Sequence, residues 1–102
     1  MMEIKIDLNK VTNKQNLLQA IGQGLGYKDE NSWGMNWDAL SDILEYLDRG
    51  GIYGTNKIIS TPVTLTFENY HEFKLHNSND FNILVNILNE NKKENPDFNY
   101  KL

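Results

Sequence analysis

Short strand-like segments alternate with longer helix-like segments along this chain, and that order restricts its fold more than any other feature. Strands are predicted at 3–8, 62–67 and 97–102, where apolar and β-branched residues gather or alternate with polar ones. Apolar residues at helical spacing occupy most of the sequence between them. Strands that are separated by helices favour a parallel sheet with right-handed crossovers, so the sequence predicts an α/β domain.

Capping residues set the expected limits of the first two helices. Thr12 is expected to be the N-cap of the first helix, in a capping box, and Gly24 lies near its expected end. Asn36 is a good N-cap for a second helix that should run to about Leu47.

The second half of the chain is expected to contain one short helical turn and one long helix. The turn is predicted between 69 and 75, and the long helix is predicted to begin after a cap at Ser78 or Asn79 and to end before Pro96. Between the second helix and the second strand, the glycine-rich stretch from Arg49 to Thr61 is predicted to be a long connection.

Length and charge narrow the possible functions. The 102 residues are enough for a single domain, 1–102, and the absence of cysteine excludes a disulfide framework and thiolate chemistry. The net charge is −4, and the segment 29–48 contains six acids and no base. Nucleic-acid binding needs a basic surface, which this composition does not offer. An acidic protein is instead suited to attract a basic partner.

The first residues alternate apolar and charged side chains and contain no long apolar run. We therefore expect neither a signal peptide nor a transmembrane segment, no association with a membrane, and a cytoplasmic location.

The second predicted helix is the most informative element for function. Its apolar residues share one side, and three acids spaced i, i+4 and i+7 share the opposite side: Asp38, Asp42 and Glu45. Two interpretations are open, a solvated acidic face and a binding site arranged in advance for cations. Trp33 and Gly34, just before the helix, favour the second, because an indole in a polar loop is often a binding anchor.

Catalysis and metal binding are weaker alternatives. Asp38 and Asp42 could act as the acid and base of a small hydrolase, but both lie on one helix face rather than across a cleft. His71 and His76 are not spaced to share a helix face, and no third ligand is close in sequence. We therefore predict no enzyme activity, no metal and no cofactor.

The segment 33–44, with the sequence WGMNWDALSDIL, resembles the motif of the barstar family. That motif has an aromatic residue and a glycine, then Asn, an apolar residue, Asp-Ala-Leu, and a second Asp four residues after the first. The segment 62–67 is similar to the family's central strand, and the last helix and strand match in order and length. The resemblance covers nearly the whole chain.

Membership of this family would imply a three-stranded parallel sheet packed by three to four helices. It would also imply that the protein is a monomer that inhibits a small, basic ribonuclease in a 1:1 complex and has no catalysis of its own. The alternative within the same fold is an immunity protein that neutralises a different, non-ribonuclease toxin.

The resemblance also implies roles for individual residues. Asp42 corresponds to the acid that enters the nuclease active site in place of a substrate phosphate, and Asp38 to a second acid that pairs at the rim. Trp33 and Gly34 would supply stacking and backbone contacts, and Glu90 on the last helix would also meet the partner. The complete predicted partner-binding set is Trp33, Gly34, Asn36, Asp38, Asp42, Glu45 and Glu90.

Three features depart from the type inhibitor of the family. Ser32 stands where an aromatic residue is usual, Met35 stands where an acid is found, and the connection Arg49–Thr61 is longer. These differences predict a target other than the type ribonuclease.

Overall fold

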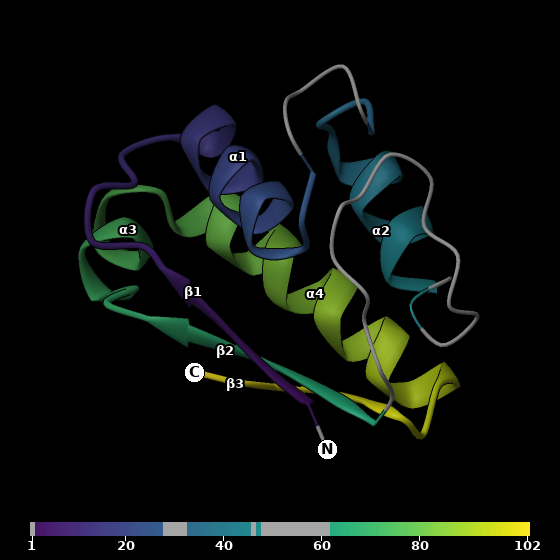
Figure 1. The fold of residues 1–102 in the computed structure, drawn as a ribbon. Helices are drawn as coiled ribbons and strands as arrows, with labels where there is room; N and C mark the ends of the chain where they lie inside the picture. The colour runs from purple at the N-terminus through teal and green to yellow at the C-terminus, as the bar shows by residue number, and fades with distance from the viewer. Residues whose placement is uncertain (1, 28–32, 46, 48–61) are drawn as a thin grey trace.

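The computed structural model describes residues 2–27, 33–45, 47 and 62–102. Its elements follow one another in the order that the sequence predicts (Figure 1). They are β1 (Met2–Asp7), α1 (Lys14–Gly24), α2 (Trp37–Glu45), β2 (Val63–Glu68), α3 (His71–His76), α4 (Ser78–Glu94) and β3 (Phe98–Lys101).

The three strands form one parallel sheet in the order β1-β2-β3, with β2 in the centre. Ile4 of β1 lies opposite Leu65 of β2, which in turn lies opposite Tyr100 of β3. The predicted α/β fold with a three-stranded parallel sheet and four helices is therefore confirmed for the described residues.

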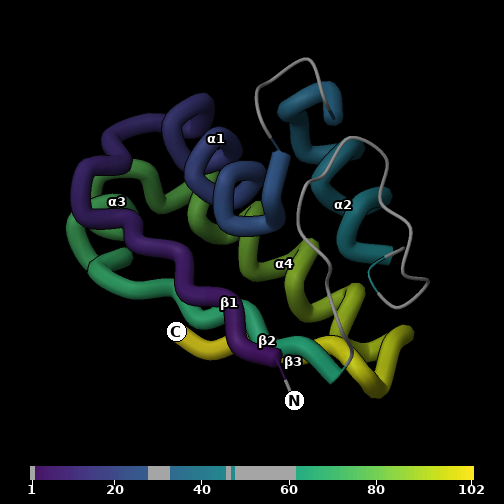
Figure 2. The backbone as a smooth tube through the Cα atoms, viewed as in Figure 1, coloured from purple at the N-terminus to yellow at the C-terminus, as the bar shows by residue number. Residues whose placement is uncertain are grey.

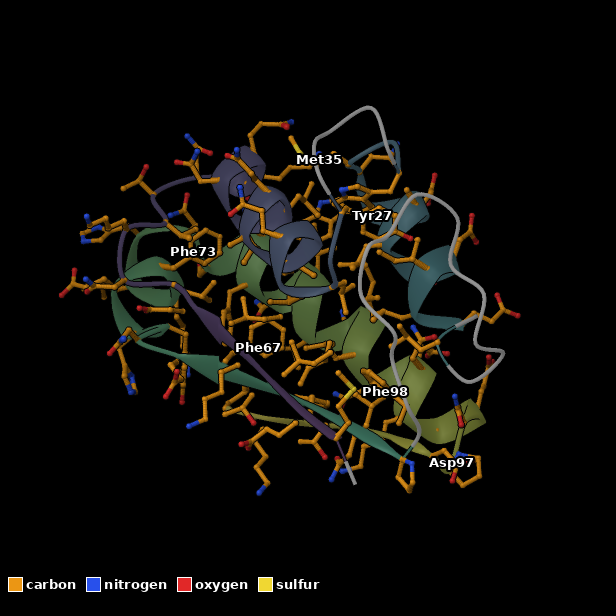
Figure 3. All side chains as sticks on the ribbon, in the orientation of Figure 1. Tyr27, Met35, Phe67, Phe73, Asp97 and Phe98 are labelled. Carbon is orange, nitrogen blue, oxygen red and sulfur yellow. The ribbon has the colours of Figure 1, made fainter. Side chains whose placement is uncertain are left out.

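One face of the sheet packs against helices, and the other is polar. Ile4 and Ile6 are buried, whereas Lys5 between them is exposed, as the twofold period of a strand requires. Figures 1 and 2 show α1, α2 and α4 on the same side of the sheet, with α3 at the end where β2 finishes. Figure 3 shows Phe67 and Phe98 between the sheet and α4, where both are buried.

The core extends from the sheet into all the helices. Its fully buried side chains come from β1, β2, β3, α1, α2, α3 and α4, so each element contributes an apolar face to one cluster. The buried hydrophobic residues are Ile4, Ile6, Leu8, Leu17, Leu18, Ile21, Leu25, Tyr27, Leu40, Leu44, Leu47, Val63, Leu65, Phe67, Phe73, Phe81, Leu84, Leu88 and Phe98.

The N-cap of α1 is Asn13, so the prediction of Thr12 is wrong. Asn13 has the extended backbone of a cap, and its Oδ1 accepts a hydrogen bond of 2.8 Å from the backbone N–H of Asn16. The Thr12 hydroxyl instead donates to Oδ1 of Asn16, at 3.1 Å. Thr12 and Asn13 are both residue types that cap helices. Asn13 has the extended backbone of a cap and bonds to the N–H three residues later.

The start of α4 also differs from the prediction. The helix begins at Ser78, so neither Ser78 nor Asn79 is its cap, and Asn77 occupies that position without a side-chain capping bond. The Asn77 side chain donates through Nδ2 to the carbonyl of Thr12, at 3.1 Å. That amide therefore ties the start of α4 to the segment before α1.

The strand limits agree with the prediction to within one residue at each end. Leu8, the last residue of the predicted first strand, donates its N–H to the carbonyl of Glu68 at 2.8 Å and continues the ladder just beyond β1. The predicted connection Arg49–Thr61 lies outside the described residues.

The carboxylate of Asp7 joins the ends of β1 and β2. Its Oδ1 accepts hydrogen bonds from Nδ2 of Asn69 and from the N–H of Asn9, both at 2.9 Å. Asn69 has a φ of 57°, a left-handed conformation that asparagine adopts more readily than most residues. The bond from Asn69, and then the bond from Asn9, lower the pKa of the Asp7 carboxyl below its usual value of 3.8.

This lowered pKa predicts a contribution to the acid stability of the fold. A carboxyl whose pKa is lower in the folded state stabilises that state above its unfolded pKa, and the contribution is lost as the pH falls through the folded value. We therefore expect Asp7→Asn to flatten the decline of the urea midpoint as the pH falls from about 5 to about 2. Glu68→Gln at the end of β2 is the charge-matched control. An unchanged pH profile in Asp7→Asn would show that these hydrogen bonds do not contribute.

Candidate partner-binding face

Asn36 fixes the first turn of α2, as the sequence predicts. Its Oδ1 accepts a hydrogen bond of 2.7 Å from the N–H of Ala39, and its carbonyl accepts one of 2.9 Å from the N–H of Leu40. Its Nδ2 donates back to the carbonyl of Gly34 at 3.2 Å. Within the described residues, the side chain of this predicted partner-binding residue therefore shapes the segment that leads into α2.

Two consecutive residues before this cap have left-handed backbone conformations. Gly34 has a φ of 89°, which glycine adopts without strain, and Met35 has a φ of 43°. A left-handed methionine costs about 1–2 kcal/mol, and such strain is found most often at functional sites. Figure 3 shows Met35 beside the beginning of α2, on the same side of the molecule as Tyr27.

The two faces of α2 differ in the way that the sequence predicts. Leu40 and Leu44 are fully buried, and α2 packs against α4. On the opposite face, three acids are exposed, and within the described residues no ion pair or hydrogen bond engages their carboxylates: Asp38, Asp42 and Glu45. Among the described residues, these carboxylates therefore form an exposed row along one side of α2.

Trp33, the possible anchor predicted from the sequence, is half-buried. Its ring centroid lies 5.8 Å from that of Tyr27, at an interplanar angle of 33°. It belongs to the partly buried side chains that pack against the core, and its indole lies over the backbone of Gly22 in α1. The indole is therefore partly engaged in packing within the chain and partly exposed.

A second tryptophan, Trp37, links the first turns of α1 and α2. The ammonium of Lys14 lies 5.8 Å from the centroid of its ring, within the range of a cation–π contact. Trp37, Gly22 and Tyr27 are absent from the partner-binding set that the sequence predicts. In the sequence, the one indication that Gly22 packs against other residues is its place on the apolar side of the first helix, beside Leu18 and Ile21.

Glu90 reaches the surface from a different element. It is exposed on α4, between the buried residues Leu88 and Asn91, and α4 is the helix against which α2 packs. Its part in a shared binding face with Asp42 stays a prediction.

The described residues do not favour the enzymatic alternative. Asp38 and Asp42 are both exposed on one side of α2, whereas acid–base catalysis by paired carboxylates places them on opposite sides of a bound substrate. His76 lies 3.4 Å from Glu72 on α3, and no group of three or more potential metal ligands occurs among the described residues. In the same part of the chain, no helix has the length and apolar character needed to cross a bilayer.

A family model described as "Barstar (barnase inhibitor)" matches residues 1–102, the whole chain. The chain belongs to the barstar family. This confirms the resemblance based on segment 33–44, and the parallel sheet with its four helices is consistent with the barstar-like fold. The family is one of ribonuclease inhibitors rather than enzymes. A comparison with individual curated proteins gave no match.

Proposed function

We propose that this protein inhibits a ribonuclease by covering its active site with the acidic face of α2 and the segment before it. The row of exposed carboxylates at Asp38, Asp42 and Glu45, which no described residue engages, carries the proposal. An active site that binds RNA must attract phosphate with positive charge, and a carboxylate can take the place of a phosphate oxygen in such a site. Membership of the barstar family supports the same assignment.

In the proposed complex, the parts of the face have different tasks. Asp42 enters the active site, Asp38 pairs at its rim, and Glu45 extends the negative field along the helix. Trp33 and Gly34 contact the partner through the indole and the backbone, and α4 adds Glu90. Asn36 holds the segment 33–36 in shape through its bonds to Gly34 and Ala39.

The direct test is inhibition of RNA hydrolysis by barnase, which the family's description names as a target, and by a ribonuclease encoded beside this chain's gene. We expect the activity of the ribonuclease encoded beside this gene to fall linearly with added inhibitor and to end at one inhibitor per enzyme. Barnase should be inhibited more weakly, as the departures at Ser32 and Met35 predict. The protein alone should not hydrolyse RNA. Full activity of both enzymes in the presence of excess inhibitor would contradict the proposal and favour the alternative, an immunity protein against a non-ribonuclease toxin.

The charge distribution predicts how fast the complex forms. Because segment 29–48 contains six acids and no base, association with a basic enzyme should be accelerated by long-range attraction. Raising salt shortens the screening length from ~10 Å at 0.1 M to ~3 Å at 1 M, so the association rate should fall clearly while dissociation changes little. Stopped-flow mixing measures both rates, and an association rate that stays flat over this range would exclude steering.

A further inference from the structure

The indole of Trp33 packs against two residues, Gly22 within α1 and Tyr27 just after it, which together are called its seat. Gly22 is buried, and a Cβ atom at this position would lie 2.6 Å from Nε1 of Trp33, 3.0 Å from Cε2 and 3.1 Å from Cζ2. Real Cβ atoms essentially never come as close as the first of these distances, so any other residue at 22 would displace the indole. The indole therefore lies directly on the helix backbone.

Hydrogen bonds at the end of α1 fix the position of Tyr27, the second residue of this seat. The N–H of Tyr27 donates to the carbonyl of Gly22 at 2.9 Å, and the N–H of Gly26 donates to that of Gln23 at 3.1 Å. Gly26 has a φ of 96°, so this is a Schellman motif with its glycine in the expected position. The motif turns the chain back, and the buried ring of Tyr27 comes to lie beside Trp33.

Trp33 lies close in sequence to the start of α2. Only Gly34 and Met35, both with positive φ, separate Trp33 from the cap residue Asn36. Because the indole is held at one end of this segment and the cap at the other, a shift of the indole moves the segment that contacts the partner.

We propose that Gly22 is a positioning residue for the partner-binding face: by leaving room for the indole of Trp33, it fixes segment 33–36. This inference rests on the proposed function. It adds a residue on another helix, without contact to the partner, that controls the geometry of the contact segment.

The test compares two glycine-to-alanine changes in the same helix. Gly22→Ala places a Cβ against Trp33, whereas Gly24→Ala, the matched control, places one 3.0 Å from Cγ1 of Ile6 and does not touch the indole. The chain has two tryptophans, so in a Trp37→Phe background the tryptophan fluorescence reports Trp33 alone. Affinity for the inhibited ribonuclease is measured separately, in the chain that retains Trp37.

We expect Gly22→Ala to change the emission maximum of Trp33 and its quenching by acrylamide, and to weaken binding by about tenfold. Gly24→Ala should leave the fluorescence of Trp33 and the affinity for the ribonuclease nearly unchanged. In a Trp33→Leu background, where the three indole atoms nearest to this Cβ are absent, Gly22→Ala should change affinity less than about twofold. If Gly22→Ala alone does not fold, the double variant Gly22→Ala/Trp33→Leu should fold.

Three results would overturn the inference. They are unchanged Trp33 fluorescence in Gly22→Ala, an affinity loss that persists in the Trp33→Leu background, and a double variant that does not fold. The fluorescence measurement needs no partner. Failure of the proposed function would appear as absence of binding by the wild-type protein, so the two failures can be distinguished.

Discussion

Replacing Asp42 with alanine is expected to weaken binding to the ribonuclease by about 2–5 kcal/mol or more, mostly through faster dissociation. The carboxylate is exposed in the free protein and has no partner among the described residues. In the complex, its loss would leave cationic groups of the enzyme buried without a counter-charge. The expected magnitude is the general one for buried charge pairs between proteins, and the barnase–barstar complex is itself among the cases that establish it.

The fold should tolerate this change, because Asp42 lies on the face of α2 opposite Leu40 and Leu44. Glu68→Ala is a suitable control, since it removes the same charge from the exposed end of β2. Dissociation rates by surface plasmon resonance and unfolding midpoints in urea should be measured on both variants. Wild-type affinity in a folded Asp42→Ala protein would falsify the assignment of Asp42 to the centre of the interface.

Truncation of Leu44 to alanine is expected to lower the free energy of unfolding by about 2–5 kcal/mol, because the removed methyl groups leave a cavity. Leu44 is fully buried and belongs to the face of α2 that packs on the core and α4. This loss is a large part of the roughly 5–15 kcal/mol that stabilises a typical domain.

The neighbouring residue provides the comparison for this second experiment. Glu45 is exposed, so Glu45→Ala should change the free energy of unfolding by no more than about 0.5 kcal/mol. Urea denaturation followed by circular dichroism measures both values. Equal stabilities of the two variants would mean that α2 is not held by its apolar face.

The sequence predicts much of this fold because its local signals agree with its long-range contacts. The alternation in β1, the cap at Asn36 and the opposed faces of α2 each follow from residues close together in the chain. The parallel sheet follows from the order of strands and helices.

Other features do not follow from the local pattern, either because neighbouring residues are equivalent in type or because residues distant in sequence decide them. Thr12 and Asn13 are both good caps, and only the backbone geometry distinguishes them. Asn77 occupies the cap position of α4, and its side chain bonds to Thr12, 65 positions away, instead of to the first turn of the helix. The seat of Trp33 depends on Gly22, which no pattern around Trp33 identifies. The positions of Asp42 and Glu90 relative to each other depend on the packing of two helices.

The pairing of β1 with β2 has a consequence for the time that the protein needs to become an inhibitor. Glu3 accepts a hydrogen bond from Thr66, 63 positions along the chain, so the centre of the sheet forms only when a long loop closes. Closing such a loop costs chain entropy before any contact repays it, and folds built on distant contacts form more slowly than helical bundles. Contacts within a helix can form before this loop closes, whereas the pairing of β1 with β2 cannot. In the proposed function, inhibition by a newly made chain would have to wait for this closure.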